Sequence, residues 1–333
     1  MTTLVRSDDA VERREALSDP VARYERMYEI RRFEDRVNEL FARGAIHGTT
    51  HLCAGQEALD VSLALELRPT DTVSATYRGH GIALALGMTV HSVLAEIMGK
   101  AAGCTGGVGG SMHLSDPDVG LLPTFAIVGA GLPVAAGAAL AYQTRGEDHV
   151  AVCVFGDGAA NIGAFHEALN LAAVWKLPVV FVCDNNVYAE YSRIDITTPL
   201  TDLHRRAGSY DIPGVPVDGM DIAATRTVLA EAVARARSGE GPTLVEAKTY
   251  RFAGHSRADQ ATYRPAGELE RWRERDPLTL ARAVLLASGA ASEDDLTALE
   301  KAVGEDLDAV AEEVTALPDP EPAAMFRNVW AAA

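Results

Sequence analysis

Two stretches of unbroken apolar residues stand out in the middle of the chain, at residues 150–155 and 179–183. Strands that are buried on both faces have this pattern, whereas half-exposed strands alternate apolar with polar positions. Between them, residues 162–175 carry apolar side chains at helical spacing, and residues 243–249 have the character of a later strand. A helix between two buried strands indicates a right-handed crossover, so this region predicts a parallel α/β sheet.

Helical spacing dominates both flanks of this centre. On the N-terminal side it predicts helices over residues 18–43, 56–67 and 90–98, with a short strand over residues 72–76. The C-terminal third is also helical. Within it, residues 293–313 are strongly acidic with Leu and Val at helical spacing, which favours an amphipathic helix over a binding tail. We find no repeats and no low-complexity linker, which favours one main domain.

Composition narrows the class of protein. The 333 residues carry a formal net charge of −17, which disfavours nucleic acid or an anionic membrane as partner, because both attract basic surfaces. A hydrophobic content of 48% with only 6% aromatic residues suits an α/β protein with close helix–sheet packing. The first 20 residues lack the apolar stretch of a signal peptide, and no apolar run reaches the ~20 residues needed to span a bilayer. We therefore expect a cytoplasmic enzyme.

The four cysteines are scattered along the chain as Cys53, Cys104, Cys153 and Cys183. A disulfide framework or a zinc site needs closer or paired spacing. Cys153 and Cys183 lie inside the two apolar runs, where a buried free thiol is expected.

The most informative chemistry lies where the two apolar strands end. Asp157 follows the first strand between Gly156 and Gly158, and Asn186 follows the second. The carboxyl ends of neighbouring parallel strands meet at one crevice, where ligands bind in open α/β sheets. Carboxylate and amide oxygens suit Mg²⁺, and a helix opening after Ala159 would offer N–H groups to a diphosphate. The alternative, that both motifs are ordinary turn residues, remains open for either one alone.

A second glycine motif admits a different interpretation. Residues 126–137 place Gly129 and Gly131 as in the dinucleotide fingerprint G-x-G-x-x-G. Val134 stands where the third glycine belongs, and Pro133 intrudes. A strand of five or six residues should precede such a motif, and none is evident. Nicotinamide binding is therefore an alternative that the sequence disfavours.

Taken together, these and several further motifs resemble the alpha subunit of the thiamin diphosphate-dependent 2-oxo acid dehydrogenase decarboxylating component, as in pyruvate and acetoin dehydrogenases. The resemblance runs through HLCAGQEA (51–58), TYRGHG (76–81), GGSMH (109–113), AIVGAGLP (126–133), GDGAAN (156–161), ALNLAAVWKLP (168–178), CDNNVYAEYS (183–192), VDGMD (217–221) and TYRFAGHS (249–256). It implies a three-layer αβα thiamin diphosphate-binding fold with a mainly parallel sheet. We place this domain at residues 46–275, with helical extensions at 1–45 and 276–333.

The resemblance also implies a role for individual residues. Magnesium would be held by Asp157, Asn186 and a backbone carbonyl near Tyr188. His255 matches the histidine of a loop over the active site, with a role in cofactor positioning and in proton or acyl transfer; a solvated loop histidine is the alternative. For His80 and His113 we favour a structural role. The residues implied to bind thiamin diphosphate are Tyr77, Arg78, Ile127, Val128, Gly156, Asp157, Gly158, Ala159, Asn186, Tyr188 and His255.

The same resemblance implies partners. In this family the glutamate that activates the cofactor's aminopyrimidine ring comes from a separate beta subunit, so we expect a heterotetramer of two alpha and two beta subunits. The acyl group taken from a small carbonyl substrate would pass to a lipoyl-bearing acyltransferase. Two alternatives are a relative that delivers a two-carbon unit to a biosynthetic carrier protein, and a non-catalytic assembly subunit.

The substrate side departs from the pyruvate dehydrogenases. We expect Thr49, His51 and Glu190 to line the substrate pocket. Thr49 replaces part of a usually aromatic pair, and Glu190 stands where methionine is typical. A carboxylate facing the pocket would repel an anionic 2-oxo acid, which favours neutral acetoin slightly over pyruvate. Ser256 matches a serine that is phosphorylated in animal pyruvate dehydrogenases, but its presence alone does not indicate regulation.

Overall fold

The computed structural model describes residues 9–326 and 329 and contains the predicted α/β sheet. Its five strands are all parallel and run in the order β1-β2-β3-β7-β6. The strands are β1 (Thr72–Ser74), β2 (Ala151–Gly156), β3 (Val179–Asn185), β7 (Thr243–Lys248) and β6 (Gly214–Asp218). The predicted fold class is confirmed, and β1 is two residues shorter than the sequence indicated.

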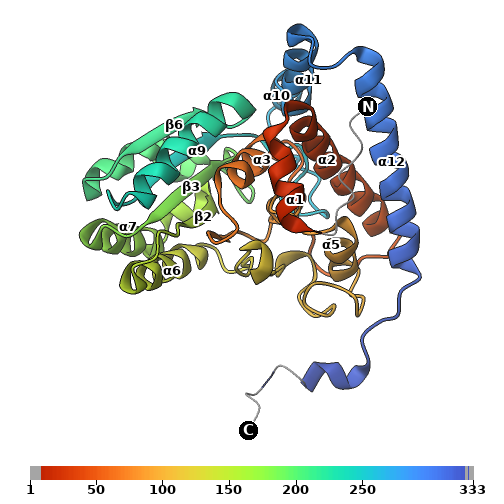
Figure 1. The fold of residues 1–333 in the computed structure, drawn as a ribbon, viewed down its shortest axis with the longest axis horizontal. Coiled ribbons are helices and arrows are strands. Elements are labelled where there is room, and N and C mark those ends of the chain that lie inside the picture. Colours follow the sequence, from red (N-terminus) through yellow and green to blue (C-terminus); the bar gives the residue numbers. More distant parts are fainter. Residues whose placement is uncertain (1–8, 327–328, 330–333) are drawn as a thin grey trace.

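Helices cover both faces of the sheet, which gives three layers (Figure 1). Alternate residues of β2 show why: Cys153 and Phe155 pack into the core beneath α6 (Gly131–Arg145) and α7 (Gly163–Trp175). Val152 and Val154 point the other way, into the core shared with a second layer of helices. That layer contains α3 (Glu57–Glu66) and α9 (Ile222–Arg237), which pack against each other. Burial on both faces explains the unbroken apolar runs.

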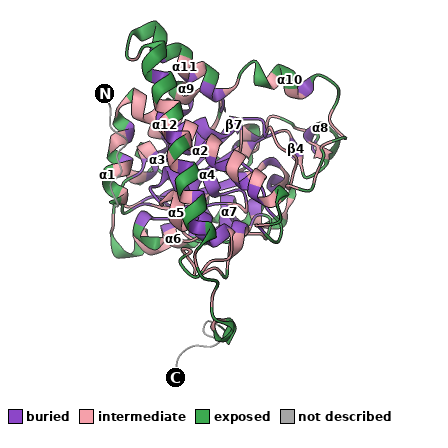
Figure 2. Cartoon of the chain, turned by 90° about the vertical axis from the view of Figure 1, so that its right-hand side faces the viewer, coloured by how far each residue is buried: buried purple, intermediate pink, exposed green. Residues whose placement is uncertain are grey.

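The remaining helices form a flank beside the second layer. The acidic C-terminal helix α12 (Glu293–Thr315) packs against α2 (Pro20–Ala42) and α5 (Val90–Ile97) through buried residues such as Leu296 and Leu307. The opposite side of α12 is exposed (Figure 2), which confirms an amphipathic helix. Two further helices in this flank are α1 (Ala10–Glu15) and α11 (Pro277–Ser288).

Within the flank, Arg31 of α2 connects three elements. It contacts Glu57 at 2.6 Å and Asp276 at 2.8 Å, so α2, α3 and the start of α11 are joined by one partly buried guanidinium. The remaining elements are short. They are η1 (Ala16–Ser18), α4 (His80–Ala85), η2 (Gly110–Met112), η3 (Pro117–Val119), η4 (Asp157–Asn161), β4 (Tyr188–Ala189), β5 (Ser192–Arg193), α8 (Ile194–Thr197), η5 (Leu203–Tyr210), α10 (Glu268–Arg273) and η6 (Pro322–Phe326).

The connections place a topological switch between β3 and β7. The β2-to-β3 crossover, α7, lies on one face of the sheet, and the β6-to-β7 crossover, α9, lies on the other. Ligands bind at such a point, outside the carboxyl ends of the strands. Both predicted strand-end motifs are at this edge of the sheet.

Two other expectations can be compared with the structure. No helix within the described part of the chain combines the length and the apolar character that a membrane span requires. All four cysteines are free thiols, and Cys153 and Cys183 are buried as predicted. Residues 1–8, which carry part of the expectation about a signal peptide, lie outside the described residues.

Candidate active site

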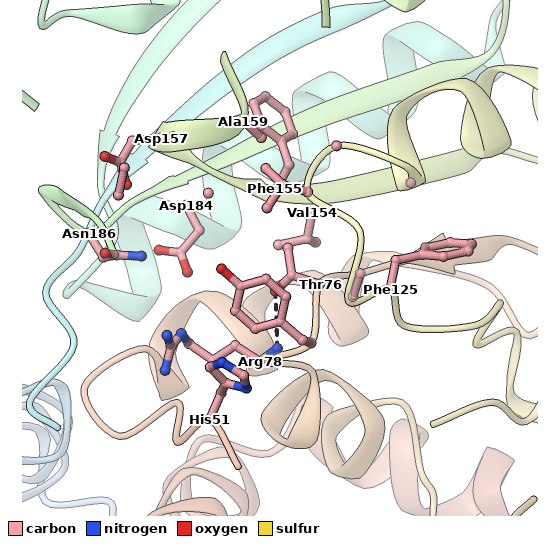
Figure 3. Close-up of a pocket in the computed structure, with 18 of the residues that line it drawn as sticks. His51, Thr76, Arg78, Phe125, Val154, Phe155, Asp157, Ala159, Asp184 and Asn186 are labelled. Atoms are coloured by element: carbon pink, nitrogen blue, oxygen red, sulfur yellow. Dashed lines mark hydrogen bonds between the residues drawn. The ribbon is translucent and has the colours of Figure 1, made fainter. Parts of the chain in front are cut away.

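Asp157 and Asn186 lie at the ends of adjacent strands, as the sequence predicts. Gly156 at the end of β2 pairs with Asp184 at the end of β3, so the residues that follow face one crevice. Asp157 and Asn186 are both buried and line a cavity of about 440 Å³. Figure 3 shows their side chains on one side of this cavity, with Arg78 on the other and Asp184 between them.

One side-chain oxygen of each residue lacks a partner. Among the described residues, Asp157 Oδ1 and Asn186 Oδ1 are buried and accept no hydrogen bond. Buried polar atoms normally have a partner, and two unsatisfied oxygens on one cavity suit a hard divalent cation. Burial, reinforced by the charge of Asp184, raises the pKa of Asp157 to about 7. A bound cation would favour the charged carboxylate. The donor set therefore fits magnesium.

The turn after β2 differs from the prediction in its secondary structure. A 3₁₀ helix, η4, occupies Asp157–Asn161, and α7 begins only at Gly163. The helix that we expected directly after Ala159 was therefore placed too early. Gly158 is required here, because a Cβ at this position would lie 2.7 Å from that of Ala189. Gly156 has open space where a Cβ would stand, so the cavity reaches its backbone.

Two buried arginines, Arg78 and Arg251, also line the cavity. Arg78 donates hydrogen bonds to the main-chain carbonyls of Leu52 (2.6 Å) and His255 (2.8 Å). Burial, together with the charge of Arg251, lowers the pKa of Arg78 to about 10, which still leaves it charged at pH 7. Two guanidinium groups that line one cavity are suited to bind an anionic ligand such as a diphosphate.

Three rings cluster beside Arg78. The ring of His51 lies 4.3 Å from that of Tyr77 and 5.0 Å from that of His255, measured between centroids. Burial and the nearby arginines lower the pKa of His255 to about 4, and burial with Arg78 lowers that of His51 to about 3. Both imidazoles are therefore neutral at pH 7. All three predicted residues line the cavity.

The loop that carries His255 is tied down by its own residues. The main-chain N–H of His255 donates to Asp259 Oδ2 at 2.6 Å, and Tyr263 donates its hydroxyl to the same oxygen at 2.7 Å. Arg251 donates to the Tyr263 hydroxyl (2.7 Å) and to the carbonyl of Glu190 (2.7 Å). This network brings the loop against the segment after β3.

Arg251 and Asp184 are site residues to which sequence reasoning gave no role. Asp184 accepts hydrogen bonds from Gln56 (2.6 Å) and from the hydroxyl of Thr249, and burial raises its pKa to about 6. Arg251 is almost fully buried and lines the same cavity. Both lie inside quoted motifs, CDNN and TYRFAGHS, so a charged residue at a strand end was the available signal.

The other predicted pocket residues divide into two groups. Glu190, Tyr188, Ile127 and Val128 line the cavity, together with Gly156, Gly158 and Ala159. Thr49 does not: it is exposed and lines a neighbouring hollow under the glycine-rich loop around Gly109. In this chain the structure thus places His51 on the cavity and Thr49 beside it, and a substrate role for Thr49 stays a prediction.

His80 has the structural role that we favoured. Its Nδ1 lies 2.7 Å from Glu34 and its Nε2 lies 2.8 Å from Ser111, so both ring nitrogens have partners in the core. His113 contacts the carbonyl of Thr124 at 3.2 Å. Neither side chain lines the cavity.

The Gly-Ala-Gly segment has a packing role instead of a dinucleotide fingerprint. A Cβ at Gly131 would lie 2.6 Å from the Ser74 hydroxyl, so the glycine lets α6 approach β1. Gly129 has φ +78° and faces Ile162. Within residues 9–326, no strand leads directly into this segment. Close packing and a positive φ therefore account for these two glycines, and a nicotinamide cofactor is not needed to explain them.

Fold and site together are typical of one class of protein, α/β enzymes whose crevice at the carboxyl edge of a parallel sheet suits a cation and a diphosphate-bearing cofactor. More specifically, this chain belongs to the family described as "Dehydrogenase E1 component", which matches residues 25–323. It is 42% identical over 308 residues to the alpha subunit of acetoin:2,6-dichlorophenolindophenol oxidoreductase of Bacillus subtilis, covering 92% of each chain.

Pyruvate dehydrogenases are similar to nearly the same degree. The chain is 39% identical over 312 residues to the pyruvate dehydrogenase E1 alpha subunit of Rhizobium meliloti, covering 93% of this chain and 90% of that one. It is 40% identical over 306 residues to the human somatic mitochondrial form, covering 91% and 77%. The chain is thus an E1 alpha subunit of the pyruvate or acetoin dehydrogenase type.

Family membership carries further consequences. The chain is a component of a thiamin diphosphate-dependent oxidoreductase. The family implies thiamin diphosphate and Mg²⁺ as cofactors. Alpha subunits of this family generally pair with a beta subunit within a dehydrogenase complex.

Proposed function

We propose that this chain forms a heterotetramer of two alpha and two beta subunits that cleaves acetoin and passes the acyl group to a lipoyl-bearing acyltransferase. Pyruvate is the second candidate substrate. Acetoin is favoured because Glu190, in the segment that follows β3, lines the cavity. A carboxylate there disfavours an anionic 2-oxo acid and leaves a neutral acyloin unaffected. Thr49 lines a neighbouring hollow and does not bear on this preference.

Different residues of the cavity are suited to the cation, the diphosphate and the rings of the cofactor. We assign magnesium to the free oxygens of Asp157 and Asn186 and to the carbonyl of Tyr188, and the diphosphate to Arg78 and the glycine turn at Gly156–Ala159. Ile127 is 72% exposed and Val128 is 48% exposed, so two apolar side chains are available to pack against the cofactor rings. When bound, thiamin diphosphate supplies the carbanion-stabilising chemistry that breaks a bond next to a carbonyl.

We assign to His255 the role of donating or accepting a proton beside the reacting carbonyl of the substrate. Its Nδ1 lies 3.4 Å from Nη1 of Arg251, which can only donate. The neutral ring therefore carries its proton on Nε2. With a pKa of about 4, the imidazole is uncharged at pH 7 and acts as a hydrogen-bond donor and weak base. A bound diphosphate would raise this pKa, because a negative charge favours the imidazolium.

Two measurements test the proposal. Native mass spectrometry of the complex from its own host should show a second chain of about 35 kDa, a usual two-domain size, with thiamin diphosphate and magnesium. Steady-state turnover should then be faster on acetoin than on pyruvate, with a lipoyl domain or an artificial dye as acceptor. A strong preference for pyruvate would exclude the acetoin assignment. Transfer only to a carrier-protein thiol would instead support the biosynthetic alternative.

A further inference from the structure

The turn that follows β3, between the proposed magnesium ligands Asn186 and Tyr188, has an unfavourable backbone conformation. Val187, which separates Asn186 from Tyr188, has φ +77°. This left-handed region is an outlier for a β-branched side chain, because its Cβ crowds the backbone. Such a conformation persists only where neighbouring groups impose it. The groups that impose it therefore control where Asn186 and Tyr188 point.

Two hydrogen bonds hold the backbone of Val187. Its N–H donates to the side-chain oxygen of Asn185 at 3.2 Å, and its carbonyl accepts from the N–H of Ile194 at 2.9 Å. The first bond is an Asx-type turn, in which a side-chain amide fixes the peptide two residues later. The left-handed conformation thus depends on the orientation of the Asn185 amide.

Glu246 fixes that orientation from the neighbouring strand. Its Oε1 accepts from the Asn185 amide nitrogen at 2.7 Å, and its Oε2 accepts from the main-chain N–H (3.0 Å) and Nδ1 (2.7 Å) of His204. Because the side-chain nitrogen of Asn185 faces a carboxylate, which can only accept, its oxygen must face Val187. Glu246 is fully buried in β7, next to β3, so its carboxylate is a rigid reference point.

The register of the two strands supports this arrangement. Asn185 pairs with Lys248, so Glu246 lies two residues earlier on the same side of the ladder, at diagonal-neighbour distance. The main chain is held too, since the N–H of Thr249 donates to the carbonyl of Asn185 at 3.0 Å. The end of β3 is therefore anchored to β7 immediately before the turn begins.

We propose that Glu246 and Asn185 are positioning residues for the cation site. They impose the left-handed turn at Val187, and this turn directs the free oxygen of Asn186 and the carbonyl of Tyr188 toward the cavity. The inference rests on the proposed magnesium site and goes beyond it, because neither residue is assigned to the cation itself. It predicts that altering either one weakens cation binding without removing a ligand.

Glu246 also belongs to a cluster with Asp202 and His204, whose ligand atoms lie within 4.8 Å of one another. This cluster does not suit a second metal. Both oxygens of Glu246 are used by Asn185 and His204, and Asp202 is paired with Lys248 at 2.5 Å. The hydrogen bonds of Glu246 to Asn185 and His204 therefore give it a structural role inside the protein.

The test measures Mn²⁺ binding to the alpha–beta complex in the presence of thiamin diphosphate, by the electron paramagnetic resonance signal of free Mn²⁺. We expect Glu246→Gln and Asn185→Ala each to weaken Mn²⁺ binding roughly 10- to 100-fold, as for other residues that orient metal ligands. Glu246→Gln keeps the shape of the side chain. It replaces one carboxylate oxygen with an NH₂ group, which then faces a donor of Asn185 or of His204. His204→Ala is the matched control, because it removes a partner of Glu246 but leaves Asn185 in contact.

A rescue variant separates positioning from general stability. Glycine adopts positive φ without steric cost, so Val187→Gly should recover most of the Mn²⁺ affinity lost in Asn185→Ala. Thermal unfolding of the apo complex need not recover in parallel. A loss of affinity in His204→Ala as large as in Glu246→Gln, or no rescue by Val187→Gly, would overturn the inference. If the wild-type complex itself binds no Mn²⁺ with thiamin diphosphate, the proposed function fails instead.

Discussion

Arg78 donates a 2.8 Å hydrogen bond from Nη2 to the main-chain carbonyl of His255, which lies 177 positions later in the chain. The same guanidinium reaches the carbonyl of Leu52 through Nη1 at 2.6 Å. One buried cation thereby connects the segment after α2 with the loop over the cavity. Any group that binds Arg78 from the cavity is consequently coupled to the position of His255.

Arg78→Lys should weaken thiamin diphosphate binding and loosen the loop. Lysine keeps the charge, but its single ammonium cannot hold two carbonyls in the planar geometry of a guanidinium. A charged hydrogen bond contributes about 2 kcal/mol, so we expect roughly 30-fold weaker binding. Isothermal titration with thiamin diphosphate at saturating Mg²⁺ measures the affinity, and limited proteolysis within residues 252–264 measures the loop. Unchanged proteolysis would contradict the coupling.

Asp157→Ala should abolish cation-dependent cofactor binding. The variant removes one of two buried free oxygens, and loss of a direct ligand should exceed the roughly 100-fold effect typical of residues that merely orient ligands. Fluorescence titration with thiamin diphosphate and Mg²⁺ gives the affinity. Asp202→Asn, a change at a half-exposed carboxylate outside the cavity, is the control and should bind normally. Co-purification with the beta subunit should persist in both variants.

Glu25 should make stability depend on pH. Burial, with the charge of Glu29 close by, raises its pKa from 4.5 to about 7. The folded chain therefore binds this proton more tightly than the unfolded chain does. The associated stability is fully present below pH 4.5 and is lost as the pH rises through 7.

Glu25→Gln should remove this dependence, because an amide mimics the protonated acid at every pH. Allowing for partial solvent screening, the variant should gain about 1–2 kcal/mol over wild type at pH 8 and nothing at pH 4.5. Urea unfolding at both pH values measures the difference. An equal effect at pH 4.5 and pH 8 would show that the proton is not involved.

The features predicted most accurately from the sequence are those that depend only on where a strand ends. Asp157 and Asn186 each follow an apolar run directly, and parallel strands necessarily bring their carboxyl ends together. The apolar pattern also predicted the parallel sheet, whereas the three-layer arrangement was implied by the family resemblance. The proposed division at residues 45/46 and 275/276 stays a prediction, since packing alone does not test it.

What sequence reasoning missed depends on tertiary contacts. Thr49 is only two residues from His51, yet Thr49 lines a neighbouring hollow whereas His51 lines the cavity. Arg251 was overlooked because its partners, Glu190 and Tyr263, come from other segments. The left-handed turn at Val187 was unforeseeable from a β-branched residue, which normally avoids positive φ. Each miss involves a conformation that distant residues impose.

Glu190→Met tests which substrate the cavity selects. Glu190 lines the cavity, and its main-chain carbonyl accepts a hydrogen bond from Arg251 at 2.7 Å. Methionine removes the negative charge while keeping a long side chain, so repulsion of a 2-oxo acid should decrease and acetoin should be little affected. At partly exposed sites such a charge contributes about 1 kcal/mol, which predicts a roughly fivefold rise in kcat/KM for pyruvate relative to acetoin. Glu190→Gln should give a similar shift if charge is responsible, whereas a shift in Glu190→Met alone would assign the selectivity to shape.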